Sequence, residues 1–231
     1  MSNVVIIPAR GGSKRIPRKN LALFDGVPMI ARSIRTALDC GLFEQVVVST
    51  DDEEIADVAR AHGATVPFMR PATLADDFTG TAAVIVHALE QLPAFDYACC
   101  LYATAPLLQA RFLCEGFELL AQHPEKSFAF SVCSFGFPVQ RALTVNGEGA
   151  LSALYPEFRN TRSQDLPEAF QDAGQFYWGR RDAWLNGEVL YSPSSLPVIL
   201  PRHLVQDIDT VEDWKRAEYL YAALKAGGEL Q

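Results

Sequence analysis

The first 134 residues alternate between short apolar runs and longer segments with helical periodicity, and this alternation constrains the fold more than any other feature. The runs NVVIIP, EQVVVST, DYACCLYAT and KSFAFSVC have the length and β-branched or aromatic content of buried strands. Segments of helical character separate them, over 27–41, 51–63, 81–92 and 111–123. Strands that alternate with helices pair in parallel through crossover connections. The sequence therefore predicts an α/β fold built on an open, mostly parallel sheet.

Residues at the ends of these segments predict finer detail. Asp51 is placed to cap the second helix, with Glu54 three residues further on. The run TVPF at 65–68 suggests a short strand. In the last helical segment, Thr210 and Asp213 have the spacing of a capping box.

The alternation breaks after Ser134, because residues 134–170 are rich in Pro, Asn, Gly and Arg and lack a helical period. A loop of this length without structure of its own is uncommon in a compact domain. We therefore expect one domain over residues 1–231, with a small β-rich insertion at about 134–170 that serves dimer contact. The runs QFYWG and LPVILP resume the strand pattern afterwards.

A basic, glycine-containing loop follows the first predicted strand, in VVIIPARGGSKRIPRKN. Ligands of parallel α/β sheets bind at the carboxyl ends of strands, where this loop lies. Gly11 and Gly12 allow backbone N–H groups to approach an anion, and Arg10, Lys14 and Lys19 can neutralise a polyphosphate. The spacing is that of neither a Walker A loop nor G-x-G-x-x-G. From charge alone, a solvated basic turn is the alternative.

The totals exclude several classes of function. The net charge is −8, from 20 Lys and Arg against 28 Asp and Glu, which disfavours a nucleic-acid partner. No apolar stretch approaches the roughly 20 residues that span a bilayer, and the N-terminal run VVII is too short for a signal peptide. Five cysteines without zinc-type pairing suggest reduced core thiols. These features predict a cytoplasmic protein that does not associate with membranes.

Two further positions suggest chemistry without deciding it. Asp207 and Asp209 alternate, so on a strand both carboxylates would face one side and could bind Mg²⁺. A pair of acids just before a helix could equally be exposed or take part in capping. Tyr102 ends an apolar strand, where it could face a ligand or be an ordinary buried aromatic residue.

A longer set of motifs occurs in order over nearly the whole chain: IPARGGSKRIPRKN, VSTDDEEIADVARAHGA, RP at 70–71, ATAP at 103–106, RNTRSQDLP and DIDTVEDW. Together they resemble the CMP-sialic acid synthetase family, the cytidylyltransferases of nonulosonic acids. The resemblance implies a Rossmann-like sheet of the nucleotide-diphospho-sugar transferase type and a homodimer. It implies transfer of CMP from CTP to a nine-carbon 2-keto acid sugar, with Mg²⁺ as cofactor and pyrophosphate as the second product. A regulatory module that binds nucleotide without catalysis is the alternative outside enzymes.

The resemblance also implies roles for individual residues. Those that match the CTP-binding and catalytic positions are Arg10, Gly11, Gly12, Ser13, Lys14, Lys19, Asn20, Arg70 and Thr81, the last two at the cytosine end. Asp207 and Asp209 match the aspartates that hold Mg²⁺, with Asp209 also counted as catalytic. Those that match the sugar side are Tyr102, Thr104, Arg162 and Gln164.

The chain departs from the sialic acid enzymes at two sugar-side positions. They usually carry glutamine where Tyr102 stands and serine where Ala105 stands. The motifs DDFTGT, ATAPLL, FPVQRAL and FRNTRSQDLPEAFQDAGQFYWG instead resemble the branch of the family that uses pseudaminic acid. We therefore expect pseudaminic acid as the substrate, with N-acetylneuraminic or legionaminic acid as the alternatives.

Overall fold

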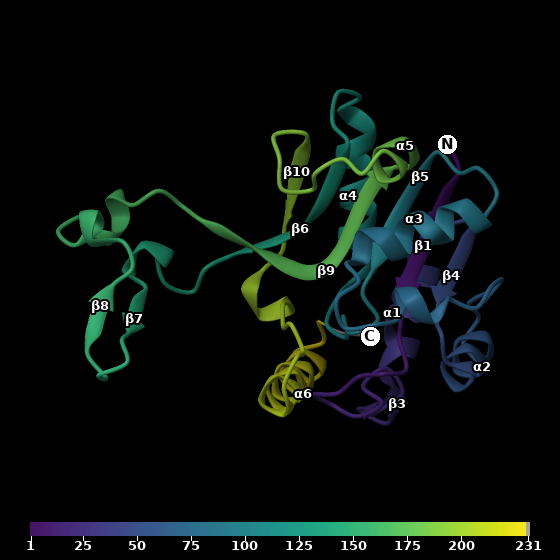
Figure 1. The fold of residues 1–231 in the computed structure, drawn as a ribbon, viewed down its shortest axis with the longest axis horizontal. Helices are drawn as coiled ribbons and strands as arrows, with labels where there is room; N and C mark the ends of the chain where they lie inside the picture. Colours follow the sequence, from purple (N-terminus) through teal and green to yellow (C-terminus); the bar gives the residue numbers. More distant parts are fainter. Residues whose placement is uncertain (230–231) are drawn as a thin grey trace.

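The computed structural model describes residues 1–229 and contains a central six-stranded sheet in the order β10-β6-β9-β5-β1-β4 (Figure 1). Its strands are β1 (Asn3–Pro8), β4 (Gln45–Ser49), β5 (Tyr97–Leu101), β6 (Phe128–Ser134), β9 (Phe170–Arg180) and β10 (Ser195–Ile199). All neighbouring pairs are parallel except those of β9, which is antiparallel to β5 and β6. The predicted open, mostly parallel sheet is confirmed, and the reversed direction of β9 is an addition to it.

Helices cover both faces of this sheet. They are α1 (Met29–Cys40), α2 (Glu53–Ala61), α3 (Thr81–Gln91), α4 (Ala110–Gln122), α5 (Arg181–Leu185) and α6 (Val211–Ala226). The short 3₁₀ helices are η1 (Ala72–Leu74), η2 (Val139–Arg141), η3 (Pro156–Phe158), η4 (Ser163–Asp165) and η5 (Arg202–Leu204). A capping box joins Thr210 and Asp213 at the start of α6, as the sequence predicts.

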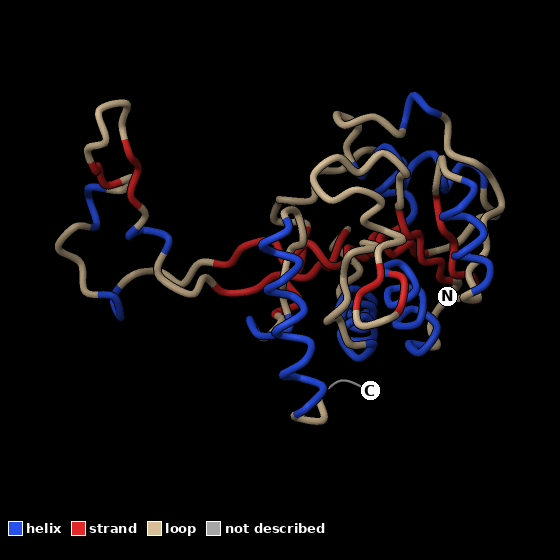
Figure 2. The backbone as a smooth tube through the Cα atoms, turned by 90° about the horizontal axis from the view of Figure 1, so that it is seen from below, coloured by secondary structure: helices blue, strands red, loops and turns tan. Residues whose placement is uncertain are grey.

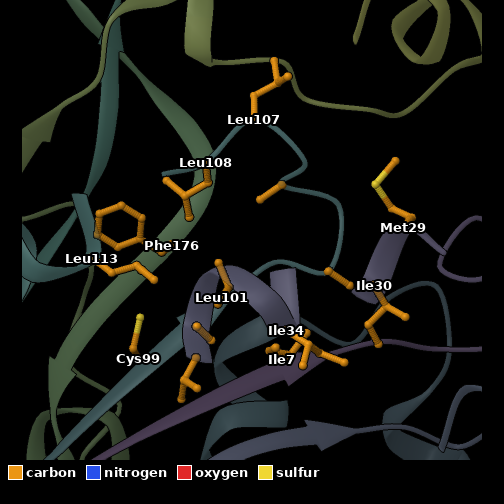
Figure 3. Close-up of a cluster of buried hydrophobic side chains, with 14 of the residues drawn as sticks. Ile7, Met29, Ile30, Ile34, Cys99, Leu101, Leu107, Leu108, Leu113 and Phe176 are labelled. Carbon is orange, nitrogen blue, oxygen red and sulfur yellow. The ribbon is translucent and has the colours of Figure 1, made fainter. Parts of the chain in front are cut away.

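Alternate residues of each strand enter separate cores on the two faces. Ile7, Leu101 and Phe176 pack with side chains of α1 and α4 in one core (Figure 3). Ile6 and Cys100, one residue earlier on their strands, face the other core with α3 and α5. Each fully buried aliphatic or aromatic side chain stabilises the fold by about 1.5–3 kcal/mol relative to exposure. The two cores therefore hold the strand ends in a fixed register.

That register brings three connections to one edge of the sheet. Pro8 of β1 pairs with Ser49 of β4, and Ile6 of β1 pairs with Cys100 of β5. The loop after β1, the turn after β4 and the segment after β5 therefore leave the sheet at the same level. The loop after β1 contains the basic motif and ends in a small hairpin of β2 (Leu23–Phe24) and β3 (Val27–Pro28).

Two local predictions are wrong. Asp52, not Asp51, caps α2, because its side chain accepts a hydrogen bond from the Ile55 N–H. TVPF is not a strand, because only Thr65 of its four residues makes a bridge, a single parallel one to Val47 of β4. The strand condition placed on Asp207 and Asp209 is not met, because residues 205–209 form no strand.

Residues 135–169 form an arm that projects from the sheet between β6 and β9 (Figures 1 and 2). The arm contains a two-stranded sheet of β7 (Leu143–Val145) and β8 (Leu151–Ala153), together with three 3₁₀ turns. Its apolar side chains are exposed, among them Phe137, Leu143, Val145 and Leu151.

All five cysteines are free. No helix within residues 1–229 has the length and apolar character needed to cross a membrane.

Candidate active site

A cavity of about 330 Å³ opens at the edge of the sheet where β1, β4 and β5 end. Nine of the residues singled out in the sequence line it: Arg10, Lys19, Asn20, Arg70, Thr81, Tyr102, Thr104, Asp207 and Asp209. Larger cavities, of about 530 and 710 Å³, lie elsewhere on the molecule and contain none of these residues. We therefore take the smaller cavity as the candidate site, because the charged residues and the strand ends meet there, although its volume is not the greatest.

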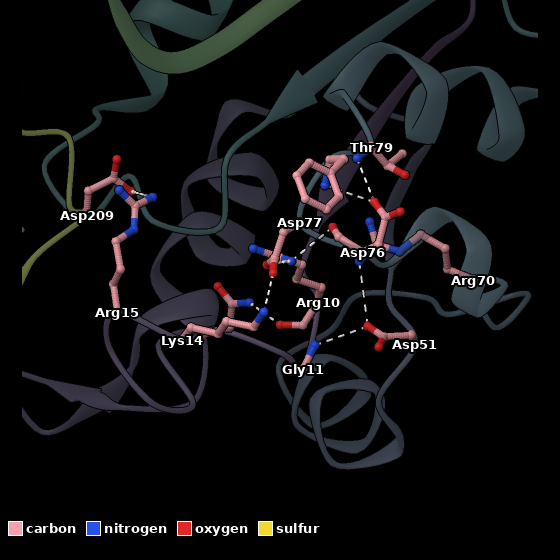
Figure 4. Close-up of polar contacts among 12 residues, drawn as sticks. Arg10, Gly11, Lys14, Arg15, Asp51, Arg70, Asp76, Asp77, Thr79 and Asp209 are labelled. Atoms are coloured by element: carbon pink, nitrogen blue, oxygen red, sulfur yellow. Dashed lines mark hydrogen bonds and ion pairs between the residues drawn. The ribbon is translucent and has the colours of Figure 1, made fainter.

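The basic loop after β1 supplies one wall of the cavity. Nη1 of Arg10 lies 2.6 Å from Oδ1 of Asp77, and Lys14 binds the other oxygen of the same carboxylate (Figure 4). Hydrogen bonds from Lys14 and Arg10 lower the pKa of Asp77. The side chain of Asn20, which is buried, donates to the backbone carbonyl of Arg10 at 3.0 Å and fixes that end of the loop. Gly11, Gly12 and Ser13 lie on the same loop, between Arg10 and Lys14.

Asp207 and Asp209 line the cavity next to the basic loop. Arg15 donates to Oδ1 of Asp209 at 2.8 Å, and Nζ of Lys19 lies 3.6 Å from the same oxygen. Burial, together with the charge of Asp209, raises the pKa of Asp207. Burial also lowers the pKa of Lys19 against the opposing effect of Asp209.

This side of the cavity fits a divalent cation. Two carboxylates beside one cavity are hard oxygen ligands, which Mg²⁺ prefers. A cation would offset the burial and the repulsion from Asp209 that together raise the pKa of Asp207. No third acidic, His or Cys side chain joins them within the described part of the chain. Mg²⁺ commonly binds with one or two carboxylates, the remaining positions being filled by water and phosphate oxygens.

Arg70 lines the cavity from behind and is only 6% exposed. Its Nε and one Nη have no hydrogen-bond partner among residues 1–229, and its nearest acid, Asp51, lies 3.7 Å away. Burial lowers the pKa of Arg70. Because unpaired buried donors are costly, a guanidinium in this state is suited to a ligand with acceptor oxygens or nitrogens.

Tyr102 and Thr81 form another wall. Their hydroxyl groups are 3.1 Å apart, so the predicted sugar-side and cytosine-side positions are neighbours. The Tyr102 ring lies 5.4 Å from that of Tyr177, whose hydroxyl donates to Asp172 at 2.7 Å. Burial raises the pKa of Tyr102. Tyr102 therefore belongs both to an aromatic cluster and to the cavity lining.

Two predicted sugar-side residues lie away from this cavity in the same chain. Arg162 and Gln164 are exposed on the projecting arm, and Arg162 pairs there with Asp165 at 2.7 Å. Neither lines the cavity.

Sequence reasoning missed four charged contributors: Arg15, Asp51, Asp76 and Asp77. Arg15 stands in the basic loop, and the acids stand in the quoted stretches VSTDDEE and DDFTGT. The signal was therefore present in the residue types, but their partners lie far away in the sequence.

Comparisons with known proteins show which family this chain resembles. The model of the cytidylyltransferase family matches residues 4–146. A pseudaminic acid cytidylyltransferase of Campylobacter jejuni is 46% identical over 225 residues, which cover 96% of this chain and 97% of that protein. The CMP-N,N'-diacetyllegionaminic acid synthase of Legionella pneumophila is 29% identical and covers 95% of this chain and 96% of that protein.

A solved structure shares the fold. It is a CMP:2-keto-3-deoxy-manno-octonic acid synthetase complexed with CTP, with a TM-score of 0.72 and 20% identity. The match covers 96% of this chain and 99% of that one. At this identity the likeness concerns the fold alone.

Proposed function

The chain belongs to the cytidylyltransferase family, and on that premise we propose that it transfers CMP from CTP to the anomeric hydroxyl of pseudaminic acid. The observation that carries the chemistry is that cations of one loop and two carboxylates of a distant segment line one cavity, where Arg15 and Lys19 pair with Asp209. The identity of 46% over almost the whole chain supports the choice of sugar.

In this reaction the anomeric oxygen forms a bond to the α-phosphorus of CTP as the hydroxyl loses its proton. The bond from the α-phosphorus to the bridging oxygen breaks, and pyrophosphate leaves. Such transfers depend mainly on positioning and on neutralising charge. Arg10, Lys14 and Lys19 would hold the phosphates, with backbone N–H groups of the glycine-containing loop. The cations act where negative charge develops on the leaving pyrophosphate.

The opposite end of CTP would lie toward Arg70 and Thr81. The unpaired donors of Arg70 suit the acceptor atoms of cytosine, and the Thr81 hydroxyl can donate or accept. Asn20 keeps Arg10 in place through the carbonyl of that residue.

Asp207 and Asp209 would hold Mg²⁺. When bound, that ion supplies charge neutralisation and polarises phosphate oxygens. Arg15 and Lys19 pair with Asp209 and so hold its carboxylate beside the cavity.

We also propose that the enzyme acts as a cytoplasmic homodimer. The arm exposes apolar side chains, with Phe137 at 86% and Leu151 at 69%, which is unusual for a surface that stays in water. Arg162 and Gln164 lie on this arm and away from the cavity of their own chain. In a dimer they would instead complete the cavity of the second copy. A supply of CTP suits the cytoplasm.

The test is a panel of nonulosonic acids incubated with CTP and Mg²⁺. We expect a CMP-sugar detected by mass spectrometry and one pyrophosphate released per sugar. The panel contains pseudaminic, legionaminic and N-acetylneuraminic acids. Absence of a CMP-sugar with every member would contradict the proposal, whereas formation only with another member would change the substrate and keep the reaction.

A further inference from the structure

One carboxylate beside the site has no part in the chemistry proposed above. Asp51 lies two residues after the end of β4, and the capping role at α2 belongs to its neighbour Asp52. Oδ1 of Asp51 accepts a hydrogen bond from the Gly11 N–H at 3.1 Å, and Nη2 of Arg70 lies 3.7 Å from the same oxygen (Figure 4). Oδ1 of Asp51 thus lies between the backbone of the basic loop after β1, here called the phosphate loop, and the buried Arg70.

The backbone around Asp51 is fixed. Ser49 and Thr50 are fully buried, and their carbonyls accept hydrogen bonds from Ala9 N–H at 3.0 Å and Arg70 N–H at 2.8 Å. The ends of β1 and β4 and the start of the segment after Arg70 are therefore tied together. Asp51 directly follows Thr50, whose carbonyl makes one of these two bonds.

Asp52 approaches the loop from the same turn. A Cβ atom at Gly11 would lie 2.5 Å from Oδ2 and 3.0 Å from Cβ of Asp52, so a larger residue would force the Asp52 side chain to move. Asp52 also accepts from Arg18 at 2.6 Å, near the far end of the loop. The turn after β4 thus holds the loop at two points, and Asp51 makes the contact at the Gly11 end.

We propose that Asp51 is a positioning residue for the nucleotide, whose carboxylate joins the phosphate loop to Arg70 and so fixes the spacing between the triphosphate and base subsites. Asp51 is not placed to touch substrate. Its negative charge offsets the burial of the Arg70 guanidinium, and its oxygen orients the Gly11 peptide. The inference rests on the proposed function, because it takes Arg70 to bind the cytosine end.

Two substitutions separate the two contacts. Asp51→Asn keeps an oxygen that can accept from Gly11 N–H but removes the charge beside Arg70. Asp51→Ala removes both contacts. The matched control is Asp57→Asn on α2, because Asp57 is exposed and pairs only with Arg60 at 2.9 Å.

Binding is measured by calorimetry without sugar, with pyrophosphate as the probe of the phosphate subsite and CTP against UTP as the probe of the base subsite. For Asp51→Ala we expect weaker binding of CTP by about tenfold, weaker pyrophosphate binding and a smaller preference for CTP over UTP. For Asp51→Asn we expect a similarly reduced preference for CTP over UTP, with pyrophosphate binding close to that of the parent.

A purely structural role would lower the melting temperature and leave affinity and base preference of the folded protein unchanged. That result, or affinities equal to those of Asp57→Asn, would overturn the proposal. Asp51→Asn nearly preserves side-chain shape, so it remains informative if Asp51→Ala does not fold. If the parent itself binds no CTP, the proposed function fails instead, which keeps the two failures distinct.

Discussion

Asp77 holds Arg10 through an ion pair of 2.6 Å, and the other oxygen of its carboxylate binds Lys14. Both cations are assigned to the triphosphate of CTP, so Asp77 lies where phosphate oxygens would bind. Asp77 belongs to a turn in which the Asp76 carboxylate accepts from the N–H groups of Phe78 and Thr79. Phe78 is 94% exposed, so the tip of the turn makes little contact with the rest of the protein.

The first prediction concerns Asp77→Asn. Removing a charge that competes with phosphate for the same cations lowers the KM for CTP by about threefold, because nucleotide no longer has to displace an ion pair. Steady-state kinetics with saturating sugar measures this, with Asp39→Asn as an exposed control that loses only a pair to Arg35. A higher KM would mean that Asp77 orients the two cations for the nucleotide rather than competing with it.

The second prediction concerns the metal. Asp209→Asn removes one anionic ligand and lowers turnover about a hundredfold or more, while the fold is retained. Chelation of Mg²⁺ abolishes the activity of the parent, and added Mg²⁺ restores it. Turnover is followed by pyrophosphate release, and folding by circular dichroism. A folded variant that works as fast as the parent excludes Asp209 as a ligand.

The third prediction concerns the arm. If Arg162 completes the site of a second copy, Arg162→Ala and Asp209→Asn proteins are each poorly active as pure dimers. Each mixed dimer then contains one intact site, which combines the unchanged Asp209 of the Arg162→Ala chain with the unchanged Arg162 on the arm of the Asp209→Asn chain. Equal mixing after reversible dissociation restores roughly a quarter of parental activity. Activity that stays at the level of the separate variants would place Arg162 in its own site or outside both.

The fourth prediction concerns the start of α6, next to Asp207 and Asp209. The Asp213 carboxylate accepts from the N–H of Asp209 at 3.2 Å and that of Thr210 at 2.8 Å. Replacing Thr210 by alanine removes half of the capping box and costs about 1 kcal/mol in the free energy of unfolding, measured by urea denaturation. A cost near zero would show that packing of α6 alone holds this segment.

The capping contact also sets a pH dependence. Hydrogen bonds from Thr210 lower the pKa of Asp213 in the folded protein. A lowered folded pKa gives stability that is present above the unfolded value of about 3.9 and is lost as the pH falls through the folded value. The difference in unfolding free energy between the parent and Asp213→Asn therefore narrows below about pH 4. An unchanged difference at lower pH would contradict this.

Much of the fold follows from the sequence because hydrophobic period and length are local properties. The direction of β9 is not local: its apolar run would suit a parallel or an antiparallel strand, and only the arm returning from β6 reverses it. The cap of α2 is Asp52 rather than the predicted Asp51. Both acids are good caps, but Asp51 instead binds the loop after β1.

The candidate site likewise has features that the sequence predicts and features that it does not. The position of the basic loop after β1 follows from the general rule for parallel sheets, and the cavity lies there. The contact between Arg10 and Asp77 spans 67 positions, and no spacing rule relates the two residues. The motif match singled out Arg162 but could not indicate that the arm would carry it away from its own cavity.

We expect the choice of sugar to depend on the side of the cavity formed by Tyr102. Its hydroxyl meets that of Thr81, and its ring packs near Tyr177, so the side chain presents an aromatic surface beside one polar group. A glutamine at this position would offer both a donor and an acceptor to sugar hydroxyls. Pseudaminic acid, with a deoxy terminus and a second acylamino group, has a less polar edge than N-acetylneuraminic acid.

The last prediction is therefore a clear preference for pseudaminic over N-acetylneuraminic acid, by up to about a hundredfold in kcat/KM, because hydroxyl groups of the wrong sugar remain unpaired against the ring. Tyr102→Gln shrinks this preference, mainly by weakening the better substrate. It leaves CTP affinity within about threefold, because the Thr81 hydroxyl retains a neighbour able to form hydrogen bonds. The measurement is kcat/KM for both sugars with parent and variant at saturating CTP and Mg²⁺. Equal efficiency with both sugars in the parent would remove Tyr102 as the determinant, and a variant with unchanged preference would move the determinant to another wall of the cavity or to the arm.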